Sequence, residues 1–167
     1  DGDSYSEISA MSESPLDPLV LWVGTDDGNV QVSKDGGKTW EEVGKNISGL
    51  PAFSYISRTI ASGAGKGTAI VSADNHRNGD FGAYIYRTTD YGKTWKQITS
   101  GLPNGAGVRS LVEYPGRPSL VFAGTEKRMH FSMDTGATWT QLNANLPPVR
   151  YDDILIHPRT KDLVLGT

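Results

Sequence analysis

SKDGGKTW, at residues 33–40, is the stretch that decides the fold of this 167-residue chain. It places an Asp, two glycines, a Thr and a Trp within eight positions. Related octets recur as TTDYGKTW at 88–95 and SMDTGATW at 132–139. They return roughly every 50 residues, a period at which internal repeats indicate a repeat architecture rather than an ordinary globular core.

Each repeat also contains short runs rich in Val, Leu, Ile and Phe, bounded by Gly, Pro, Asp and Asn. This pattern is typical of β-strands, and no window shows the apolar spacing of a helix. The predicted strands lie at 7–12, 19–24, 29–33 and 39–43 in the first repeat, at 55–61, 68–73, 83–88 and 94–98 in the second, and at 108–113, 119–124, 129–132 and 138–142 in the third.

Four-stranded units in series predict an all-β fold, a β-propeller of four-stranded antiparallel blades. We expect the 1–167 chain to form a single partial propeller. Its blades would span about 7–51, 52–103 and 104–147, followed by half a blade at 148–167. Half a blade leaves an open sheet edge, which folded proteins avoid. We therefore expect the remaining blades to come from the same chain or from another chain.

Composition excludes several classes of function. The 16 basic and 19 acidic residues give a net charge of −3, so no basic surface is expected to attract nucleic acid. No run approaches the roughly 20 apolar residues of a membrane span, and no signal peptide is visible. The chain has no cysteine, and its histidines, His76, His130 and His157, are dispersed. We therefore expect no membrane insertion, no metal and no cofactor.

Each octet lies between the third and fourth predicted strands, and so forms a hairpin connection. Its Asp can accept hydrogen bonds from N–H groups of the turn, its second Gly is expected to take a positive φ, and its Trp can bury its ring against a neighbouring blade. A catalytic or calcium site would need the three aspartates to converge, whereas successive blades place them around a perimeter. The expected structural residues are Asp35, Trp40, Asp90, Trp95, Asp134 and Trp139.

The three octets resemble the Asp-box, or bacterial neuraminidase repeat, of sialidases, xyloglucan-cleaving glycoside hydrolases and sortilin-type receptor propellers. With Gly-Leu-Pro at 101–103 and IHPRTKDLVLGT at 156–167, the chain looks most like large secreted bacterial proteins of the sortilin-like, glycosyl hydrolase-like class. Thr88, Met133 and Thr135 depart from the usual box residues, but the Asp, Gly, Thr and Trp positions are kept. The resemblance implies a propeller and an extracellular or cell-surface location.

Successive turns of an up-and-down blade alternate between its two ends, so the boxes share one end with the turns between first and second strands. The other end, here called the loop face, carries the loops between second and third strands and the connections between blades. Propeller ligands are expected there. Candidate ligand-binding residues on this face are Asp26, Asp27, Asp74, His76, Arg77, Asp80, Phe81, Glu126, Arg128 and Arg150.

The longest segment of the loop face is DNHRNGDF, at 74–81, which exceeds the usual length of a hairpin loop. Long loops on rigid scaffolds often bind ligands. The alternative is a solvated excursion held by local Asp and Asn turns.

Two functions remain open. The first is a non-catalytic scaffold that binds a glycan or protein ligand through the loop face. The alternative is part of a glycoside hydrolase, with Asp27 and Asp152 as the carboxyl pair, which must lie about 5–10 Å apart across the bond. Asp26 and Asp27 could equally be turn-forming residues before Gly28. A sialidase, which needs convergent arginines for a carboxylate, is less favoured, although Arg77, Arg128 and Arg150 are all expected on this face.

Overall fold

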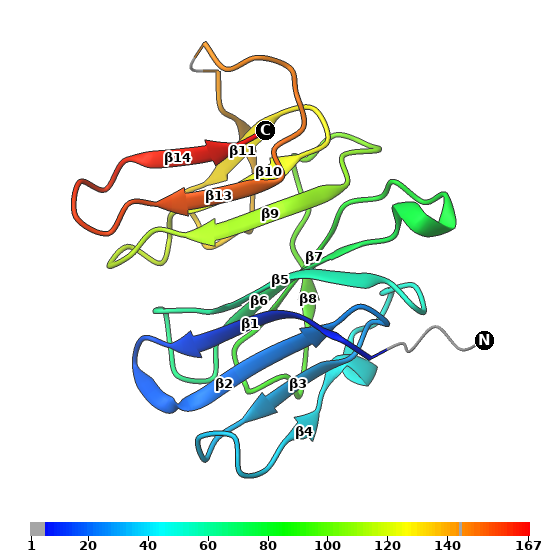
Figure 1. The fold of residues 1–167 in the computed structure, drawn as a ribbon, viewed down its shortest axis with the longest axis vertical. Helices are drawn as coiled ribbons and strands as arrows, with labels where there is room; N and C mark the ends of the chain where they lie inside the picture. Colours follow the sequence, from blue (N-terminus) through cyan, green and yellow to red (C-terminus); the bar gives the residue numbers. More distant parts are fainter. Residues whose placement is uncertain (1–5, 144) are drawn as a thin grey trace.

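The computed structural model describes residues 6–143 and 145–167. Figure 1 shows that these residues form sheets and loops, with two short 3₁₀ turns, η1 (Gly44–Asn46) and η2 (His76–Asn78). The first sheet contains β1 (Ile8–Ser14), β2 (Asp17–Thr25), β3 (Val30–Ser33) and β4 (Glu41–Glu42); the second β5 (Tyr55–Ala61), β6 (Ala69–Asp74), β7 (Tyr84–Thr88) and β8 (Lys96–Gln97); the third β9 (Val108–Glu113), β10 (Val121–Thr125), β11 (Met129–Ser132) and β12 (Thr140–Gln141); and the last β13 (Asp153–Ile156) and β14 (Leu163–Gly166).

Every sheet is an antiparallel meander in which strands pair in sequence order. The prediction of three four-stranded blades and half of a fourth is therefore confirmed. The outer strands β4, β8 and β12 are shorter than predicted, with two residues each. In the third blade, the backbone N–H of Trp139 donates to Ser100 O of the preceding blade (2.8 Å), and β12 begins at the next residue.

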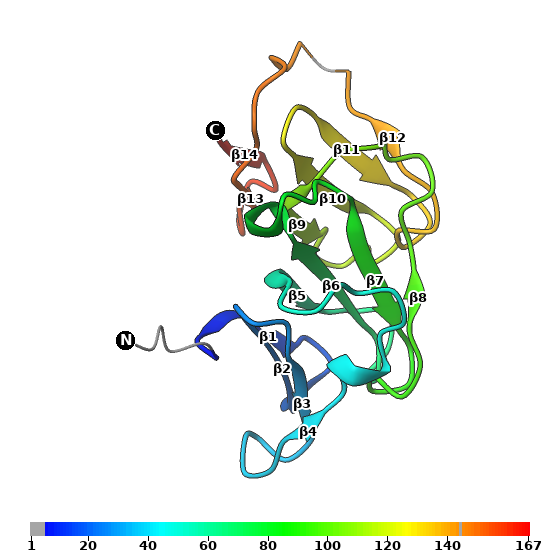
Figure 2. The ribbon, with the colours of Figure 1, turned by 90° about the vertical axis from the view of Figure 1, so that its right-hand side faces the viewer.

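The sheets are arranged as a fan (Figure 2). Strands β1, β5, β9 and β13 lie side by side at its inner edge, and β4, β8 and β12 lie at its outer edge. Apolar side chains alternate along the strands and pack between successive sheets. Three buried clusters result, one at each interface between blades, centred on Trp22 and Ile56, on Ile70 and Val108, and on Met129 and Ile154.

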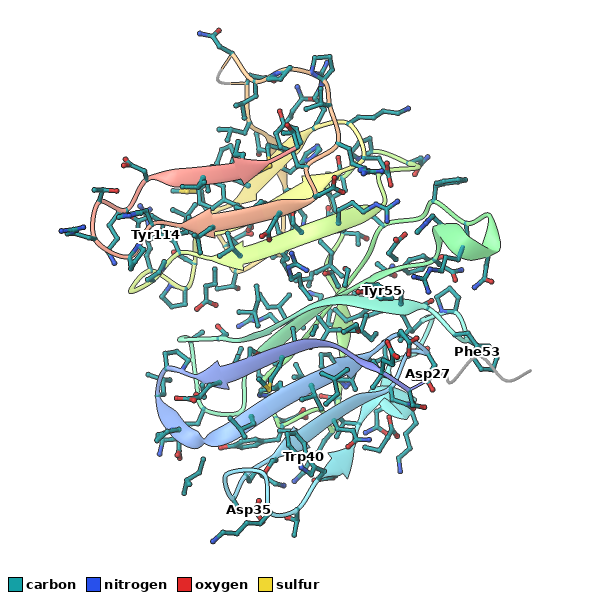
Figure 3. All side chains as sticks on the ribbon, in the orientation of Figure 1. Asp27, Asp35, Trp40, Phe53, Tyr55 and Tyr114 are labelled. Carbon is teal, nitrogen blue, oxygen red and sulfur yellow. The ribbon has the colours of Figure 1, made fainter. Side chains whose placement is uncertain are left out.

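The two ends of the blades carry different loops, as the alternation of turns predicts. In Figure 3, Asp27, Phe53 and Tyr55 lie at one end, and Tyr114, Asp35 and Trp40 lie toward the other. We call the second end the box face. Within the described residues, no helix is long and apolar enough to cross a membrane.

Candidate functional site

The first Asp-box is a closed network of hydrogen bonds within its own turn. Asp35 accepts bonds from the backbone N–H of Thr39 (2.9 Å) and from its hydroxyl (2.6 Å). The Ser33 hydroxyl donates to Asp35 (2.8 Å) and accepts from the N–H of Gly37 (2.8 Å), whose φ is +88°. The same bonds recur at Asp90 with Thr94, Thr88 and Gly92, and at Asp134 with Thr138, Ser132 and Gly136.

These bonds have an electrostatic consequence. Each favours the ionised carboxylate, and the threonine hydroxyl has the largest effect, so the pKa of Asp35, Asp90 and Asp134 falls from 3.8 to about 2. The three boxes belong to three different sheets. Within residues 6–143 and 145–167, no group of three His, Cys, Asp or Glu side chains could hold a metal ion. The geometry supports a role in the turn for each box.

The box tryptophans pack toward the preceding blade. Trp139 is 4% exposed and donates its indole N–H to Ile98 O of the second blade (2.8 Å). Trp95 meets Trp22 of the first blade edge-to-face, with ring centroids 6.0 Å apart. Trp40, in the first blade, is 40% exposed and donates its indole N–H to Gly37 O of its own turn (3.1 Å). The box is thus a joint between blades as well as a turn.

On the loop face, Asp26 and Asp27 tie the loop between β2 and β3 to the start of β1. Asp26 Oδ1 accepts from the backbone N–H groups of Ser6 and Glu7 (3.0 Å each). Asp27 accepts from the hydroxyls of Thr25 and Ser6 and from the side chain of Asn29. These bonds, that from Thr25 first, lower the pKa of Asp27, so this carboxyl is poorly suited to donate a proton as a general acid.

The segment 74–81 begins with a buried ion-pair cluster. Asp74, at the end of β6, has a side chain only 4% exposed and lies 2.5 Å from both Arg109 Nη1 and His76 Nδ1. The Arg109 guanidinium also binds Glu126, with Nε 2.5 Å from Oε1. Sequence reasoning placed Arg109 in a strand and missed this role. The only signal in the sequence was the position of Arg109 between two predicted loops that carry carboxylates, at Asp74 and at Glu126.

The rest of this segment is held by local bonds. Asp80 accepts from the Tyr84 hydroxyl (2.6 Å), Asn75 Nδ2 (3.0 Å) and the Gly82 N–H (2.9 Å). The Tyr84 bond, the largest influence, lowers the pKa of Asp80, and Asp80 in turn raises the pKa of Tyr84 to about 12. Phe81 is 53% exposed. Much of the segment is therefore a structured excursion, as the alternative interpretation expected.

Arg77 stands apart from that network. Its guanidinium lies over the ring of Tyr55, 5.3 Å from the centroid. At this distance the positive charge of Arg77 is attracted to the face of the aromatic ring. Arg77 lines a hollow of about 320 Å³ together with Asp26, Phe53 and Asn78. Phe53 was not among the residues predicted from sequence. Figure 3 shows it projecting at the loop face near Asp27.

Among the remaining predicted residues, Arg150 interacts with Asp152 and with Glu126: the hydrogen bond to Asp152, and then the charges of Asp152 and Glu126, raise the pKa of Arg150. Arg150 pairs with Asp152 (Nε to Oδ1, 2.8 Å) on the connection before β13. Asp27 is bonded within the first blade and Asp152 pairs with Arg150, so among the described residues no shared partner joins the carboxyl pair Asp27 and Asp152. Arg77, Arg128 and Arg150 are likewise not joined through a shared partner among the described residues.

A larger hollow lies at the box face and was not predicted. It has a volume of about 560 Å³. The inner strands of three blades line it, together with the turns that join the first and second strands of these blades. Its lining residues include Leu16, Ile60, Pro118, Glu13 and Glu113. Glu113 accepts from Ser62 Oγ (2.5 Å) and Gly63 N (2.8 Å) of the neighbouring blade. Burial raises its pKa above 4.5. These bonds give Glu113 a role in joining two blades.

Solved structures share this fold. A GH74 xyloglucanase from Xanthomonas campestris aligns with a TM-score of 0.72 and 19% identity, over 95% of this chain and 26% of the enzyme. The extracellular domain of a one component system from B. thetaiotaomicron aligns with a TM-score of 0.70 and 18% identity, over 99% of this chain and 20% of that chain. At these identities the likeness concerns the fold alone.

Sequence comparisons identify the family. The BNR/Asp-box repeat model matches residues 31–42, around the first box. Sortilin from Rattus norvegicus is 29% identical over 151 residues, which make up 87% of this chain and 16% of sortilin. The chain thus spans a small part of the length of this relative. The Sortilin-Vps10 model, described as sortilin, neurotensin receptor 3, matches residues 83–167, half of the chain. On this match, the chain belongs to the Sortilin-Vps10 family.

Proposed function

We propose that this chain is an Asp-box propeller segment of a secreted or cell-surface protein, and that it binds a glycan or protein ligand through its loop face. One observation carries the proposal. The box aspartates use their oxygens within their own turns, whereas Arg77 and Phe53 present a cation and an aromatic ring beside a hollow of the loop face. Exposed aromatic and Arg side chains are enriched where proteins bind ligands.

The family and the fold support the location. The chain is similar to sortilin, and its fold is shared with an extracellular domain. Charge is also compatible with this proposal, because a net charge of −3 gives no strong attraction to nucleic acid. A ligand bound at the loop face would lie across the connections between blades, where propellers commonly bind their ligands.

Substitutions at the two ends of the blades test the proposal. Ligands are first identified for the full-length protein with a glycan array and with candidate protein partners. Arg77→Ser on the loop face should then weaken the binding of the identified ligand, whereas Asp90→Asn on the box face should lower thermal stability and leave affinity unchanged. Affinity that depends on Asp90 and not on Arg77 would contradict the proposal.

A hydrolysis screen separates this function from a glycoside hydrolase. The full-length protein is incubated with polysaccharides, and released reducing ends are measured for wild type and for the variants Asp27→Asn and Asp152→Asn. If the chain is a non-catalytic binding scaffold, we expect no turnover by wild type or by either variant. Turnover that either substitution abolishes would establish the hydrolase instead, because both variants keep the size of the side chain and remove only its charge.

A further inference from the structure

A small hollow between the second and third blades carries two positive charges. It has a volume of about 220 Å³ and is lined by Arg87 of β7 and Lys96 of β8, with the hydroxyl-bearing Thr89 and Thr94 beside them. No acidic side chain is among the described residues that line it. Arg87 and Lys96 lie directly opposite each other on the paired strands, where two like charges destabilise a sheet.

The other two blades show that the repeat does not require these charges. In the first blade the corresponding pair is Val32 and Glu41, and Glu41 forms an ion pair with Lys34 (3.1 Å). In the third blade the corresponding pair is Phe131 and Thr140, which carry no charge. The second blade therefore departs from the repeat at this place, and the departure adds two uncompensated cations.

Arg87 has no partner that explains its position. Its Nε is buried and has no acceptor among the described residues, a costly state for a charged group. Burial is the largest influence on the pKa of Glu113, and the charge of Arg87 is the smallest. The oxygens of Glu113 accept from Ser62 and Gly63 instead. A ligand in the hollow would supply the guanidinium with an acceptor.

Lys96 alone could be explained by the edge of the sheet. β8 is the outer strand of the second blade, and a lysine on an edge strand discourages pairing with another chain. Arg87 is different, because it lies on β7, inside the sheet, and its side chain is half-buried against the third blade. Protection of the edge does not account for the pair.

The walls of the hollow are fixed by contacts between the two blades. Ile98 of the second blade and Ala137 of the third box both line it. The indole N–H of Trp139 donates to Ile98 O (2.8 Å), and a Cβ on Gly136 would lie 2.4 Å from Ile98 Cδ1. The box turn therefore packs tightly on the second blade, and a preformed site binds its ligand with little cost of ordering. Figure 2 shows β8 and β12 at the outer edge of the fan, where the hollow is reached from solvent.

Size and charge indicate the class of ligand. The hollow is smaller than the sites of drug-sized ligands, about 300–1,000 Å³, so it suits a small group, free or at the end of a larger molecule. A guanidinium binds oxyanions through parallel N–H bonds, and the Lys96 ammonium adds a second positive charge. A group with several oxygens and up to two negative charges matches this arrangement better than a carboxylate does.

We propose that the hollow between the second and third blades binds a sulfate or phosphate group through Arg87 and Lys96, with the Thr89 hydroxyl as a further donor. The site lies beside the boxes at the outer edge, so it goes beyond ligand binding at the loop face and does not depend on it. Loss of either charge-assisted interaction should weaken binding about 10- to 100-fold.

The test is titration calorimetry of the full-length protein with sodium sulfate, sodium phosphate and sodium acetate at constant ionic strength. Arg87→Val and Lys96→Thr introduce the residues that the first and third blades carry at these positions, so both variants should fold. Thermal denaturation without added oxyanion checks this. Wild type should bind sulfate and phosphate more tightly than acetate, and each substitution should weaken that binding. The tighter of the two anions then identifies a sulfate ester or a phosphate ester as the natural group.

Lys38→Ala is the matched control. Lys38 is exposed in the first box, at the position that Ala137 occupies in the third, so the variant also removes one positive charge beside a box. It should bind sulfate and phosphate as wild type does. Wild-type binding no tighter than that of acetate, undiminished binding by Arg87→Val or by Lys96→Thr, or an equal loss in Lys38→Ala would each overturn the inference.

Discussion

Arg109 and Asp74 form an ion pair between adjacent blades, with Arg109 Nη1 2.5 Å from Asp74 Oδ2. The Asp74 side chain is 4% exposed and that of Arg109 is 19% exposed. The same guanidinium binds Glu126 on the loop after β10. One side chain of β9 therefore joins the end of β6 to a loop of its own blade. Loss of this cation would leave a buried carboxylate without its strongest partner, a costly state in a protein interior.

We predict that Arg109→Met lowers the free energy of unfolding by about 3–5 kcal/mol, measured by chemical denaturation, because Asp74 then stays buried without its cation and keeps only its contacts with His76. The double variant Arg109→Met/Asp74→Asn should recover part of this loss. Arg150→Met is the matched control, since Arg150 and Asp152 are about half exposed and such pairs contribute about 0–1 kcal/mol. Equal losses at Arg109 and Arg150 would contradict the buried cluster.

The box glycines give a second prediction. Gly92 and Gly37 both have positive φ, +80° and +88°, so Ala at either position is strained. A Cβ on Gly92 would also lie 2.6 Å from Val43 of the preceding blade, whereas one on Gly37 would meet nothing closer than 3.6 Å.

We therefore expect Gly92→Ala to destabilise the protein by about 1–3 kcal/mol more than Gly37→Ala does, which is the usual cost of overpacking. Thermal and chemical denaturation of the two variants measure the difference. If both lose the same stability, only the turn conformation matters and the box is not a joint between blades.

The blades could be predicted from the sequence because each is a local unit. Consecutive runs of apolar residues predict the strands of each four-stranded meander, and each turn between the third and fourth strands contains its own octet. The predicted second-blade strand 55–61 coincides with β5, Tyr55–Ala61. The predicted third outer strand, 138–142, is longer than β12, because the bond from Trp139 to Ser100 depends on a neighbouring blade.

The candidate site was harder to predict because its contacts are not local. Arg109 and Glu113 lie on one strand, yet their partners Asp74 and Ser62 belong to another blade. Register along β9 decides which side chain meets which loop, and no spacing in the sequence encodes it. Phe53 carries no motif at all. Its exposure and its positive φ are properties of the folded connection.

Acid should weaken the boxes. Hydrogen bonds, chiefly from Thr94, hold the pKa of Asp90 at about 2, below its ordinary 3.8. The folded state therefore binds this proton less tightly than the unfolded chain. The stabilisation is complete above pH 3.8 and is lost as the pH falls toward 2. Asp90→Asn should reduce this acid dependence of the melting temperature. A difference from wild type that stays constant between pH 2 and pH 6 would contradict the assignment.

Glu113 should show the opposite dependence. Burial raises its pKa above 4.5, although bonds from Ser62 and Gly63 partly offset the shift. Because the folded state binds this proton more tightly, the contribution of Glu113 to stability is greatest below pH 4.5 and falls as the pH rises through its folded-state pKa.

Glu113→Gln, permanently neutral and of the same size, should remove that fall and leave the free energy of unfolding at pH 7 within about 1 kcal/mol of wild type, because relief of a buried charge offsets a weaker hydrogen bond. Glu113→Ala should cost about 1–3 kcal/mol, since Ser62 and Gly63 then lose their acceptor. Denaturation curves from pH 4 to pH 8 for wild type and both variants measure these effects. If Glu113→Gln and Glu113→Ala lost equal stability at every pH, the carboxyl would not be the joint between the second and third blades. The two carboxyl groups thus have opposite pH dependences. The negative charge of Asp90 stabilises its box turn, whereas the negative charge of Glu113, at the inner edge of the blades, opposes folding.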